Sequence, residues 1–451
     1  MKILLTVHCF YPKHIYGTET YTLEIAKALK EIGHDVCILT ANSHTEQIGD
    51  KQYGEYSYDG VSVISLDTSK KPVKRFRDTY FRNDFNDLIG SIIDDFKPDI
   101  IHCLHTLNLS VAFLKVIEEK GIPAILTMTD FFGICFNYIL KRGDDSFCKG
   151  PDRCSSNCLE CYLSAHGRLE ALKNSSGAIG RLCGSYKVLS YLSILSKSSD
   201  LPLLNTSRDI VQRKDIIKNH YKVFKKLVAP TDFLAKTYIS NGFPKDKIQK
   251  LTFGINRKPL IGYTNPRTDF DKPLTFGYIG QISVHKGVDL LVNAFNQLDS
   301  GDTKLKIYGD TNQDIKFTEK LKNLIGTREN IQFLGTFPRE NLGKVLREID
   351  VLVIPSIWYE NAPLVLLNAL ATRTPVIVSD VDGMNEFIKH DFNGFLFSQG
   401  DVHELYKLLK NCCEYPDELV RISNNANYEK SIQDNVKEYL DIYSEYLGVY
   451  K

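Results

Sequence analysis

Long apolar runs and an excess of charge of one sign are both missing from this chain of 451 residues. No stretch reaches the roughly 18 apolar residues of a membrane-spanning helix, so the sequence predicts no such helix. Lysine and arginine number 56 against 55 aspartate and glutamate residues, which argues against nucleic acid as a partner. With 43% hydrophobic residues, the chain has instead the composition of a globular protein of two or three domains.

A dinucleotide-binding motif and a secretion signal are also missing. No Gly-x-Gly-x-x-Gly follows either strand that opens a predicted domain, which disfavours a Rossmann-type dehydrogenase. The apolar stretch at residues 1–9 is short and lacks a small-residue cleavage site, so it predicts a first strand. Eleven cysteines without such a signal indicate a reducing compartment. We therefore expect a cytoplasmic location, at the inner face of a membrane if the basic segment described below binds lipid.

Short apolar strands alternate with helices, and the pattern starts twice. Strands are predicted at residues 2–7, 34–40, 61–66, 99–105, 123–130, 227–231 and 248–255, and again at 274–280, 304–309, 331–334, 351–354, 376–379 and 393–397. Helices are predicted at residues 21–33, 85–96 and 288–298, and from 402 and about 429 onward. Runs of this kind are typical of parallel sheets buried on both faces. We therefore expect an α/β fold with two Rossmann-like domains, at residues 1–256 and 273–428, joined by a Pro- and Gly-rich linker.

The loop after the strand at 351–354 holds the strongest candidate binding residues. Ligands of open α/β sheets bind at the carboxyl ends of strands, where this loop places Glu360 and Asn361. Pro363 then opens a helix, because its missing N–H costs nothing there. Free N–H groups at a helix start favour an anion, so Glu360 suits sugar hydroxyls and the helix suits a phosphate. A solvated acid in an ordinary strand–helix–strand unit is the alternative.

A second loop, at residues 281–287, supplies a positive charge. Lys286 lies between the C-terminal end of a predicted strand and the N-terminus of a predicted helix. A lysine together with free N–H groups forms a phosphate-binding cradle at such a point. The alternative is a lysine that is merely solvated.

The sequence at residues 358–371, which begins Trp-Tyr-Glu-Asn-Ala-Pro-Leu, resembles the E-x7-E region of retaining glycosyltransferases of family 4. That family has the GT-B fold, with two facing Rossmann-like domains and a nucleotide sugar in the cleft between them. Its first glutamate contacts the donor sugar and its second the ribose, which implies these roles for Glu360 and Asn368. Its paired Arg and Lys neutralise the diphosphate. Here Gln281 replaces the Arg, and Lys286 matches the Lys.

The resemblance extends to the predicted N-terminal domain. Gly17 and Thr18 correspond to a glycine-rich loop beside the donor phosphate and the acceptor, although Thr18 could serve only as a helix cap. Asp130 corresponds to an acidic residue at the sugar–acceptor site, with Thr129 in place of the family's histidine. His105, at another strand exit, either lines the same site or is structural.

Four cysteines, Cys148, Cys154, Cys158 and Cys161, lie in a loop-like segment inside a predicted insertion at residues 135–226. Thiolates at such spacing suit a tetrahedral zinc ion, which would stabilise a loop that lacks its own core. Four thiolates leave no open coordination position, so the candidate zinc site is structural. Free thiols, or disulfides in an oxidising compartment, are the alternatives.

The second part of this insertion, residues 163–226, is strongly basic. It carries twelve lysine and arginine residues against four acids, interleaved with tyrosine, leucine and isoleucine. A basic face with aromatic side chains suits an anionic membrane surface. A solvated helix face is the alternative.

Together with the resemblance, these features predict a hexosyltransferase that moves a sugar from a UDP- or GDP-sugar to a glycan or lipid-linked acceptor in cell-surface polysaccharide synthesis. Retention of the anomeric configuration is implied by the resemblance alone. By the resemblance, residues 1–256 bind the acceptor, and the last helix, at 429–451, packs back on them. No divalent ion is expected to be required, because Lys286 and helix dipoles can stabilise the leaving group. The predicted catalytic residues are Glu360, Lys286 and Asp130. The predicted substrate-binding residues are Gly17, Thr18, His105, Thr129, Gln281, Asn361, Ala362, Pro363, Leu364, Asn368, Gly383 and Glu386, of which the last two resemble the family's turn near the donor sugar.

Two other functions stay open. A non-catalytic subunit that binds a nucleotide sugar is favoured by the altered positions Thr129, Gln281 and Asn368. A nucleotide-sugar epimerase on the same two-domain plan would need neither an acceptor nor a basic membrane face.

Overall fold

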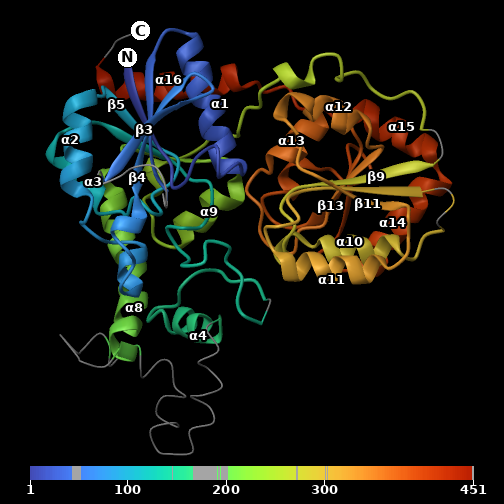
Figure 1. Cartoon of the computed structure of the whole chain (residues 1–451), viewed down its shortest axis with the longest axis horizontal. Coiled ribbons are helices and arrows are strands. Elements are labelled where there is room, and N and C mark those ends of the chain that lie inside the picture. The colour runs from blue at the N-terminus through green and yellow to red at the C-terminus, as the bar shows by residue number, and fades with distance from the viewer. Residues whose placement is uncertain are drawn as a thin grey trace, which may run out of the picture. The chain divides into compact units, whose positions relative to one another are not determined.

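The protein consists of two compact α/β units in a computed structural model that describes residues 1–42, 52–144, 146–165, 190, 193, 202–270, 273–299, 301 and 303–448 (Figure 1). The N-terminal unit comprises Met1–Pro230, Leu234–Leu251 and Val436–Lys451. The C-terminal unit comprises Thr231–Phe233 and Thr252–Asn435. Apart from the short excursion at Thr231–Phe233, the chain therefore passes between units after residues 251 and 435, near the boundaries of 256 and 428 drawn from the sequence. The α/β fold class is confirmed.

An eight-stranded sheet forms the centre of the N-terminal unit, and every strand pair except the β3–β4 hairpin is parallel. The strands, in sequence order, are β1 (Lys2–Thr6), β2 (Asp35–Asn42), β3 (Tyr53–Tyr58), β4 (Val61–Asp67), β5 (Ile100–Cys103), β6 (Ala124–Thr127), β7 (Lys226–Ala229) and β8 (Ile248–Lys250). The helices are α1 (Gly17–Glu31), α2 (Asn86–Phe96), α3 (Phe113–Glu119), α4 (Ser156–Ala165), α8 (Pro202–His220), α9 (Asp232–Ser240) and α16 (Ile432–Leu447). The first residues of α9, up to Phe233, and of α16, up to Asn435, belong to the C-terminal unit. Helices cover both faces of the sheet, with α2 and α3 opposite α1 (Figure 1).

Strand order in this sheet reverses beside β1. The sheet runs β3-β4-β2-β1-β5-β6-β7-β8, so the chain moves one way from β1 to β2 and the other way from β5 to β8. The loops that follow β1 and β5 therefore leave the same edge of the sheet next to each other. In open α/β sheets, such a reversal creates the position where ligands bind.

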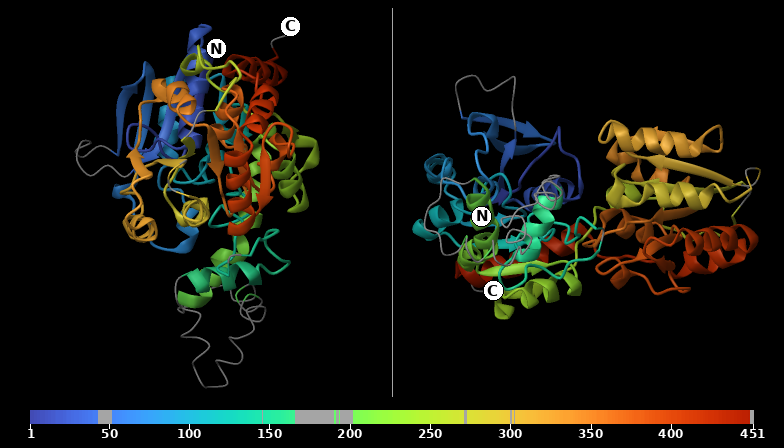
Figure 2. Two further views of the ribbon diagram at one scale, coloured as in Figure 1. Left: turned by 90° about the vertical axis from the view of Figure 1, so that its right-hand side faces the viewer. Right: turned by 90° about the horizontal axis from the view of Figure 1, so that it is seen from below.

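A six-stranded, fully parallel sheet forms the centre of the C-terminal unit. Its strands are β9 (Leu274–Ile279), β10 (Thr303–Tyr308), β11 (Ile331–Gly335), β12 (Val351–Ile354), β13 (Val376–Asp380) and β14 (Phe395–Ser398). Its helices are α10 (Val288–Phe295), α11 (Ile315–Ile325), α12 (Leu342–Arg347), α13 (Leu364–Ala371), α14 (Val402–Glu414) and α15 (Pro416–Asn425). Figure 2 shows helices on both faces of this sheet. The order β11-β10-β9-β12-β13-β14 reverses between β9 and β12.

The cysteine segment is partly helical, which corrects the expectation of a loop. Cys158 and Cys161 lie on α4, and α4 packs against α8 through a small apolar cluster of Leu159, Leu163 and Ile210. The two helices lie side by side at one end of the unit (Figures 1 and 2). The segment therefore has a small core of its own.

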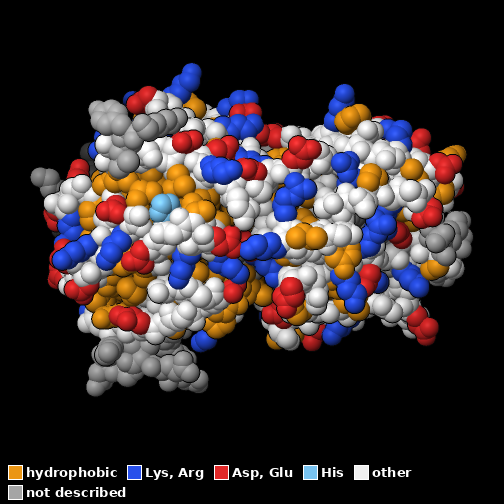
Figure 3. Space-filling view, turned by 90° about the horizontal axis from the view of Figure 1, so that it is seen from above, with side chains coloured by type: hydrophobic (Ala, Val, Ile, Leu, Met, Phe, Trp, Pro, Cys, Tyr) orange, Lys and Arg blue, Asp and Glu red, His pale blue; other side chains and the backbone are white. Residues whose placement is uncertain are grey.

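Most of the predicted membrane-binding segment lies outside the described residues. Within its described part, Arg213 is buried, donates to the carbonyl of Phe132 at 2.6 Å and lies 4.8 Å above the ring of that residue, so it is a structural residue. On the face drawn in Figure 3, basic and acidic side chains of the described residues are interspersed. Among the described residues, none of the helices is both long and apolar enough to cross a membrane.

The C-terminal helix α16 fastens to the sheet of the N-terminal unit through buried tyrosines. His102 on β5 is fully buried, and its Nδ1 and Nε2 lie 2.7 Å from the hydroxyl of Tyr443 and 2.8 Å from that of Thr127. Tyr439 reaches the hydroxyls of Thr127 and of Tyr21 at 2.9 and 3.1 Å. Burial lowers the pKa of His102 to about 3, so the imidazole is neutral in the folded protein.

This buried histidine predicts an acid-sensitive fold. Unfolding returns its pKa to about 6.5, so the unfolded chain binds one more proton below that pH, and the free energy of unfolding falls by about 1.4 kcal/mol per pH unit down to about pH 3. Urea unfolding between pH 7 and pH 5 measures this slope. His102→Gln should reduce the slope, whereas His403→Gln, on the exposed side of α14, should leave it unchanged; equal slopes in all three proteins would contradict the assignment.

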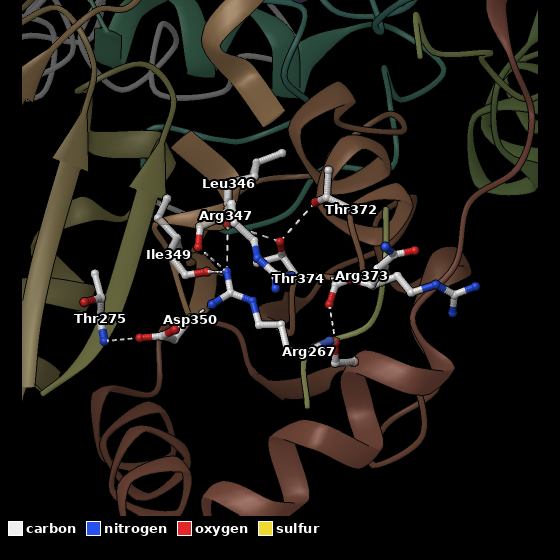
Figure 4. A network of polar contacts seen from close by, with 11 residues as sticks. Arg267, Thr275, Leu346, Arg347, Ile349, Asp350, Thr372, Arg373 and Thr374 are labelled. Carbon is white, nitrogen blue, oxygen red and sulfur yellow. Dashed lines mark hydrogen bonds and ion pairs between the residues drawn. The ribbon is translucent and has the colours of Figure 1, made fainter. Parts of the chain in front are cut away.

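The predicted linker contributes a buried arginine to the C-terminal unit (Figure 4). Arg267 donates to a carboxylate oxygen of Asp350 at 2.6 Å and to the backbone carbonyls of Leu346, Arg347 and Ile349. The second oxygen of Asp350 accepts the N–H of Thr275 at 2.7 Å. These carbonyls lie at the C-terminal end of α12 or just beyond it. The partial negative charge of a helix C-terminus stabilises a cation there, in this case the guanidinium. The contacts fix the linker and the starts of β9 and β12 to one another.

Burial opposes both charges of this pair: it lowers the pKa of Arg267 and raises that of Asp350. Removing one partner leaves the other charge buried alone, so we expect Arg267→Met to lower the unfolding free energy of the C-terminal unit by about 3–5 kcal/mol. Hydrogen exchange of the β9 and β12 amides in urea reports that unit separately.

The matched control is Arg257→Met in the same linker, where the guanidinium donates to one carbonyl, that of Glu429, at 3.1 Å. Its expected cost is about 1 kcal/mol or less. The double variant Arg267→Met, Asp350→Asn should lose less than the sum of its single variants. Additive losses would show that the two side chains act independently.

Candidate active site

Three loops of the C-terminal unit meet at its strand-order reversal. They follow β9, β12 and β13, which are neighbours in the sheet, so their carboxyl ends lie along one edge. Lys286 comes from the first loop, Glu360 from the second and Gly383 from the third. The structure therefore brings together three of the residues predicted from sequence.

An ion pair between Lys286 and Glu360 forms the centre of this site. Lys286 Nζ lies 2.7 Å from Glu360 Oε1, and the two side chains are 19% and 8% exposed. The hydroxyl of Ser356 and the indole N–H of Trp358 donate to the same oxygen, at 2.6 and 2.7 Å. Oε2 of Glu360 takes part in none of these three bonds and can accept a bond from a ligand.

The carboxylate of Glu360 is ionised because its donors outweigh its burial. Burial alone would raise its pKa, but the charge of Lys286 and the hydrogen bonds from Lys286, Ser356 and Trp358 lower it below the ordinary value. Lys286 Nζ also lies 4.6 Å from the centre of the Trp358 ring, a cation–π contact. An ammonium has three donors, so one bond to Glu360 leaves others for an anion.

Two glycines permit the close approach of these loops. A Cβ at Gly287 would lie 1.9 Å from the carbonyl oxygen of Pro355, and one at Gly383 would lie 1.8 Å from that of Glu360. Both glycines have positive φ, at 68° and 87°. Any side chain at either position would push a neighbouring loop away from the ion pair.

The helix start predicted beside Glu360 is present. Pro363 is the residue before α13, Leu364 is its first residue, and Ala362 has a φ of 52°, which is uncommon for a residue with a side chain. The chain thus turns sharply after Asn361, and the first N–H groups of α13 have no partner within the helix. Asn368, on the same helix, is buried and donates its amide to the carbonyl of Leu364 at 2.6 Å.

Gln281 and Glu386 are not among the residues that bond to Glu360. Gln281 is half-buried, and its backbone carbonyl accepts a hydrogen bond from the hydroxyl of Tyr278 at 2.6 Å. Glu386 accepts the N–H groups of Asp232 and Phe233 at 2.8 and 2.7 Å within the C-terminal unit. The carboxylate of Glu386 is therefore engaged with the backbone, a contact that sequence reasoning did not foresee.

A second cluster of site residues lies in the N-terminal unit. His105, after β5, lies with Nε2 2.9 Å from Asp130 Oδ2, while its Nδ1 accepts the N–H of Leu107 at 2.9 Å. The backbone donor assigns the proton to Nε2, which donates to Asp130. Asp130 Oδ1 accepts the N–H of Phe132 at 2.7 Å, and the Thr129 hydroxyl donates to the carbonyl of Leu104 at 3.3 Å.

The capping role considered for Thr18 is wrong. Helix α1 begins at Gly17, four residues before the expected start, and the residue before it, Tyr16, makes no side-chain cap. Thr18 lies inside the first turn, where its carbonyl accepts the hydroxyl of Thr22 at 2.7 Å. A Cβ at Gly17 would meet no atom within 4 Å, so the helix start is open at this point.

Two residues that sequence reasoning missed, His8 and Glu19, join this second cluster. His8 follows β1, and its Nε2 lies 3.4 Å from Oε1 of the buried Glu19 on α1. The rings of His8 and His105 are 4.4 Å apart. The sequence offered one signal for Glu19: it is an acid in Gly17-Thr18-Glu19 that directly precedes the apolar face of a helix.

The predicted zinc ligands are only partly gathered. Burial raises the pKa of Cys158, and the nearby thiols of Cys135, Cys148 and Cys161 raise it further. Among the described residues, no three His, Cys, Asp or Glu side chains are placed to hold a metal ion. Structural zinc stays a prediction, which metal analysis of the purified protein would test.

Two Asp-x-Asp sequences, a type that can bind divalent ions, also escaped sequence reasoning. They lie at residues 269–271 and 380–382. Asp271 is outside the described residues, and Asp380, at the end of β13, accepts the amide of Asn385 at 2.9 Å. The expectation that catalysis needs no divalent ion therefore stays a prediction that requires its own test.

Comparisons with known proteins match both units. Residues 265–428 match the family model for glycosyl transferases group 1, and residues 16–154 match that for a glycosyl transferase 4-like domain. An uncharacterised glycosyltransferase of Methanocaldococcus jannaschii is 29% identical over 45% of this chain and 51% of its own length. The amylovoran biosynthesis glycosyltransferase AmsK of Erwinia amylovora is 26% identical over 44% and 52%. The chain thus spans about half the length of these curated relatives.

Solved structures share the fold over the whole chain. Anabaena HepE, in complex with UDP-glucose, has a TM-score of 0.64 at 14% identity over 99% of this chain and 100% of its own. A glycosyltransferase of Rickettsia africae has a TM-score of 0.63 at 17% identity over 100% and 99%. Identities this low show the fold alone. Two matching domain models in the expected order, on two units with this fold, show that the chain belongs to the GT-B glycosyltransferases, with a 4-like N-terminal domain and a group 1 C-terminal domain.

Proposed function

We propose that the protein is a retaining hexosyltransferase that uses a nucleotide-diphosphate sugar. The observation that carries this proposal is the ion pair between Lys286 and Glu360 at the strand-order reversal of the C-terminal unit. It places a positive charge, which suits a diphosphate, beside an ionised acid, which suits sugar hydroxyls.

Lys286 would neutralise the diphosphate as it leaves. Its ammonium lies just before α10, and α13 begins in the neighbouring loop. Free N–H groups at the two helix starts add partial positive charge on the same edge. A fixed arrangement of this kind stabilises charge that develops on the leaving oxygen, so we propose that no divalent ion is required.

Glu360 would hold the sugar, and Asn368 the ribose. Oε2 of Glu360 can accept a bond from a sugar hydroxyl while Oε1 keeps its three protein donors. The amide N–H of Asn368 is used by the carbonyl of Leu364, which leaves its side-chain oxygen as the acceptor for a ribose hydroxyl.

The acceptor is proposed to be a glycan or a lipid-linked sugar, bound by the N-terminal unit. A relative from Escherichia coli, 29% identical over 30% of this chain and 35% of its own length, is named a UDP-Gal:alpha-D-GlcNAc-diphosphoundecaprenol alpha-1,3-galactosyltransferase. That name and the UDP-glucose complex of HepE favour a UDP-sugar over a GDP-sugar. Such an acceptor agrees with membrane contact through residues 163–226.

A non-catalytic subunit that binds a nucleotide sugar is the second candidate. Gln281 lacks the charge that the family's arginine supplies, and Glu386 is engaged with the backbone. A subunit of this kind would bind the donor without transferring it. A nucleotide-sugar epimerase would convert the donor in the absence of any acceptor.

Calorimetric titration with UDP- and GDP-sugars, together with transfer assays in EDTA, tests this proposal. We expect Lys286→Met to weaken donor binding by about 10- to 100-fold, because it removes a charge-assisted hydrogen bond worth about 1.5–3 kcal/mol. Glu360→Gln should lower the transfer rate by about 100-fold or more, since the variant cannot pair with Lys286 or grip the sugar equally well.

The control is Lys320→Met, which removes an exposed lysine that pairs with Asp289 at 2.9 Å in the same unit. It should bind the donor like the wild-type protein. Transfer that survives in Glu360→Gln, or binding that is equally weakened in Lys320→Met, would contradict the proposed site. Donor binding without transfer or conversion would establish the non-catalytic subunit.

A further inference from the structure

The chain contains one tryptophan, and it lies between two loops of the candidate active site. The indole N–H of Trp358 donates to Oε1 of Glu360 at 2.7 Å, while its ring centre lies 4.6 Å from Nζ of Lys286. The ring also packs edge-on against that of His285, with the ring centres 4.5 Å apart. One side chain therefore contacts the acid, the cation and the loop that carries the cation.

Backbone and amide contacts hold the loop of Trp358 independently of the ion pair. The N–H of Ile357 donates to the backbone carbonyl of His285 at 3.0 Å, and the side-chain amide of Gln399 donates to the carbonyl of Ile357 at 2.9 Å. These bonds join the residue before Trp358 to two other segments of the C-terminal unit. Trp358 itself is half-buried. The position of the indole therefore does not depend on Lys286 alone.

A bound diphosphate would compete with Glu360 for the ammonium of Lys286. In the structure, this ammonium shares one carboxylate oxygen with two neutral donors, the hydroxyl of Ser356 and the indole of Trp358. A diphosphate carries more negative charge than a carboxylate, so it attracts the ammonium more strongly. Of the three donors, the two neutral ones then stay with the buried carboxylate. A buried anion that loses its cation needs such donors to keep its place.

We propose that Trp358 is a positioning residue, which keeps Glu360 directed at the donor sugar while Lys286 turns to the diphosphate. The inference rests on the proposed function and gives the indole a task that involves no contact with the ligand. Its N–H holds Oε1, so that Oε2 keeps its direction toward a sugar hydroxyl. Its ring face offers the ammonium a second attractive contact. Because Trp358 acts through Glu360, it should affect binding of the sugar more than binding of the nucleotide.

The single tryptophan gives one signal that needs no assignment. Protein labelled with nitrogen-15 at the indole shows one indole N–H resonance, which reports the bond to Glu360. At about pH 8 and without nucleotide, Glu360→Gln should move this resonance to higher field, because an N–H that donates to a carboxylate resonates at lower field. Lys286→Met should leave it near the wild-type position, because the bond does not need the lysine. A Lys286→Met resonance at the Glu360→Gln position would overturn the proposal.

Donor affinity distinguishes positioning from simple packing. The probes are UDP and UDP-glucose, titrated by calorimetry. Trp358→Phe keeps an aromatic ring beside the ammonium but removes the N–H. The ratio of the dissociation constant of UDP-glucose to that of UDP should therefore rise about tenfold, while UDP binds within about twofold of wild type. Equal losses for both probes, or no loss for either, would overturn the proposal.

The matched control is Tyr359→Phe, which changes the neighbouring aromatic residue and keeps its ring, 4.6 Å from that of Phe233 in the same unit. It should preserve the indole resonance and both affinities. A control that raises the ratio as much as Trp358→Phe would overturn the proposal. A wild-type protein that binds neither UDP, GDP nor their sugars would refute the proposed function and the role toward the donor. The indole resonance of Lys286→Met would still decide whether Trp358 holds Glu360 without the lysine.

Discussion

A buried carboxylate persists only where donors and a cation replace water, and in the C-terminal unit this constraint centres on Glu360. Three donors converge on one of its oxygens, from Lys286, Ser356 and Trp358. Removing one partner of a buried ion pair costs about 3–5 kcal/mol, which is comparable to a large part of the stability of a domain. The loops around Glu360 are therefore fixed by this interaction before any ligand arrives.

Backbone constraints serve the same centre. Gly287 and Gly383 adopt left-handed conformations and each stands where a Cβ would overlap a carbonyl oxygen of the neighbouring loop. Ala362 also has a positive φ, one residue before the proline that precedes α13. Uncommon conformations of this kind cost free energy, and they persist where the surroundings fix them. Their concentration around one carboxylate supports a functional reason for the geometry.

Sequence patterns predicted the parallel strands, because these are short apolar runs bounded by polar loops. They missed β3 (Tyr53–Tyr58), the antiparallel strand, whose side chains are only half-buried or exposed. The strand at 351–354 was placed to the residue, since all four side chains are buried. The start of α1 at Gly17 was missed because no capping side chain marks it. Tyr16, the residue before the helix, makes no cap hydrogen bond, and the helix is stabilised by packing. Arg267 was assigned to a linker by composition, although the four partners of its guanidinium come from a chain segment that only the fold brings near. Lys286 and Glu360 could be nominated because each follows a recognisable strand, but the bond between them spans 74 residues.

The sequence does not separate His8 and Glu19 from ordinary residues. His8 follows the predicted first strand much as His105 ends another, and a glutamate in the first turn of a helix resembles an ordinary solvated acid. Only burial distinguishes it, because the carboxylate of Glu19 is held among the loops of two strands that are adjacent in the sheet and far apart in sequence. In both units, then, the reversal of strand order forces two loops together and allows an acid to be buried beside a basic group. Lys286 and the other donors of the C-terminal unit lower the pKa of Glu360, whereas burial in the N-terminal unit raises the pKa of Glu19 to about 7. One topology thus places an acid beside a basic side chain in both units, with opposite effects on the pKa of the acid.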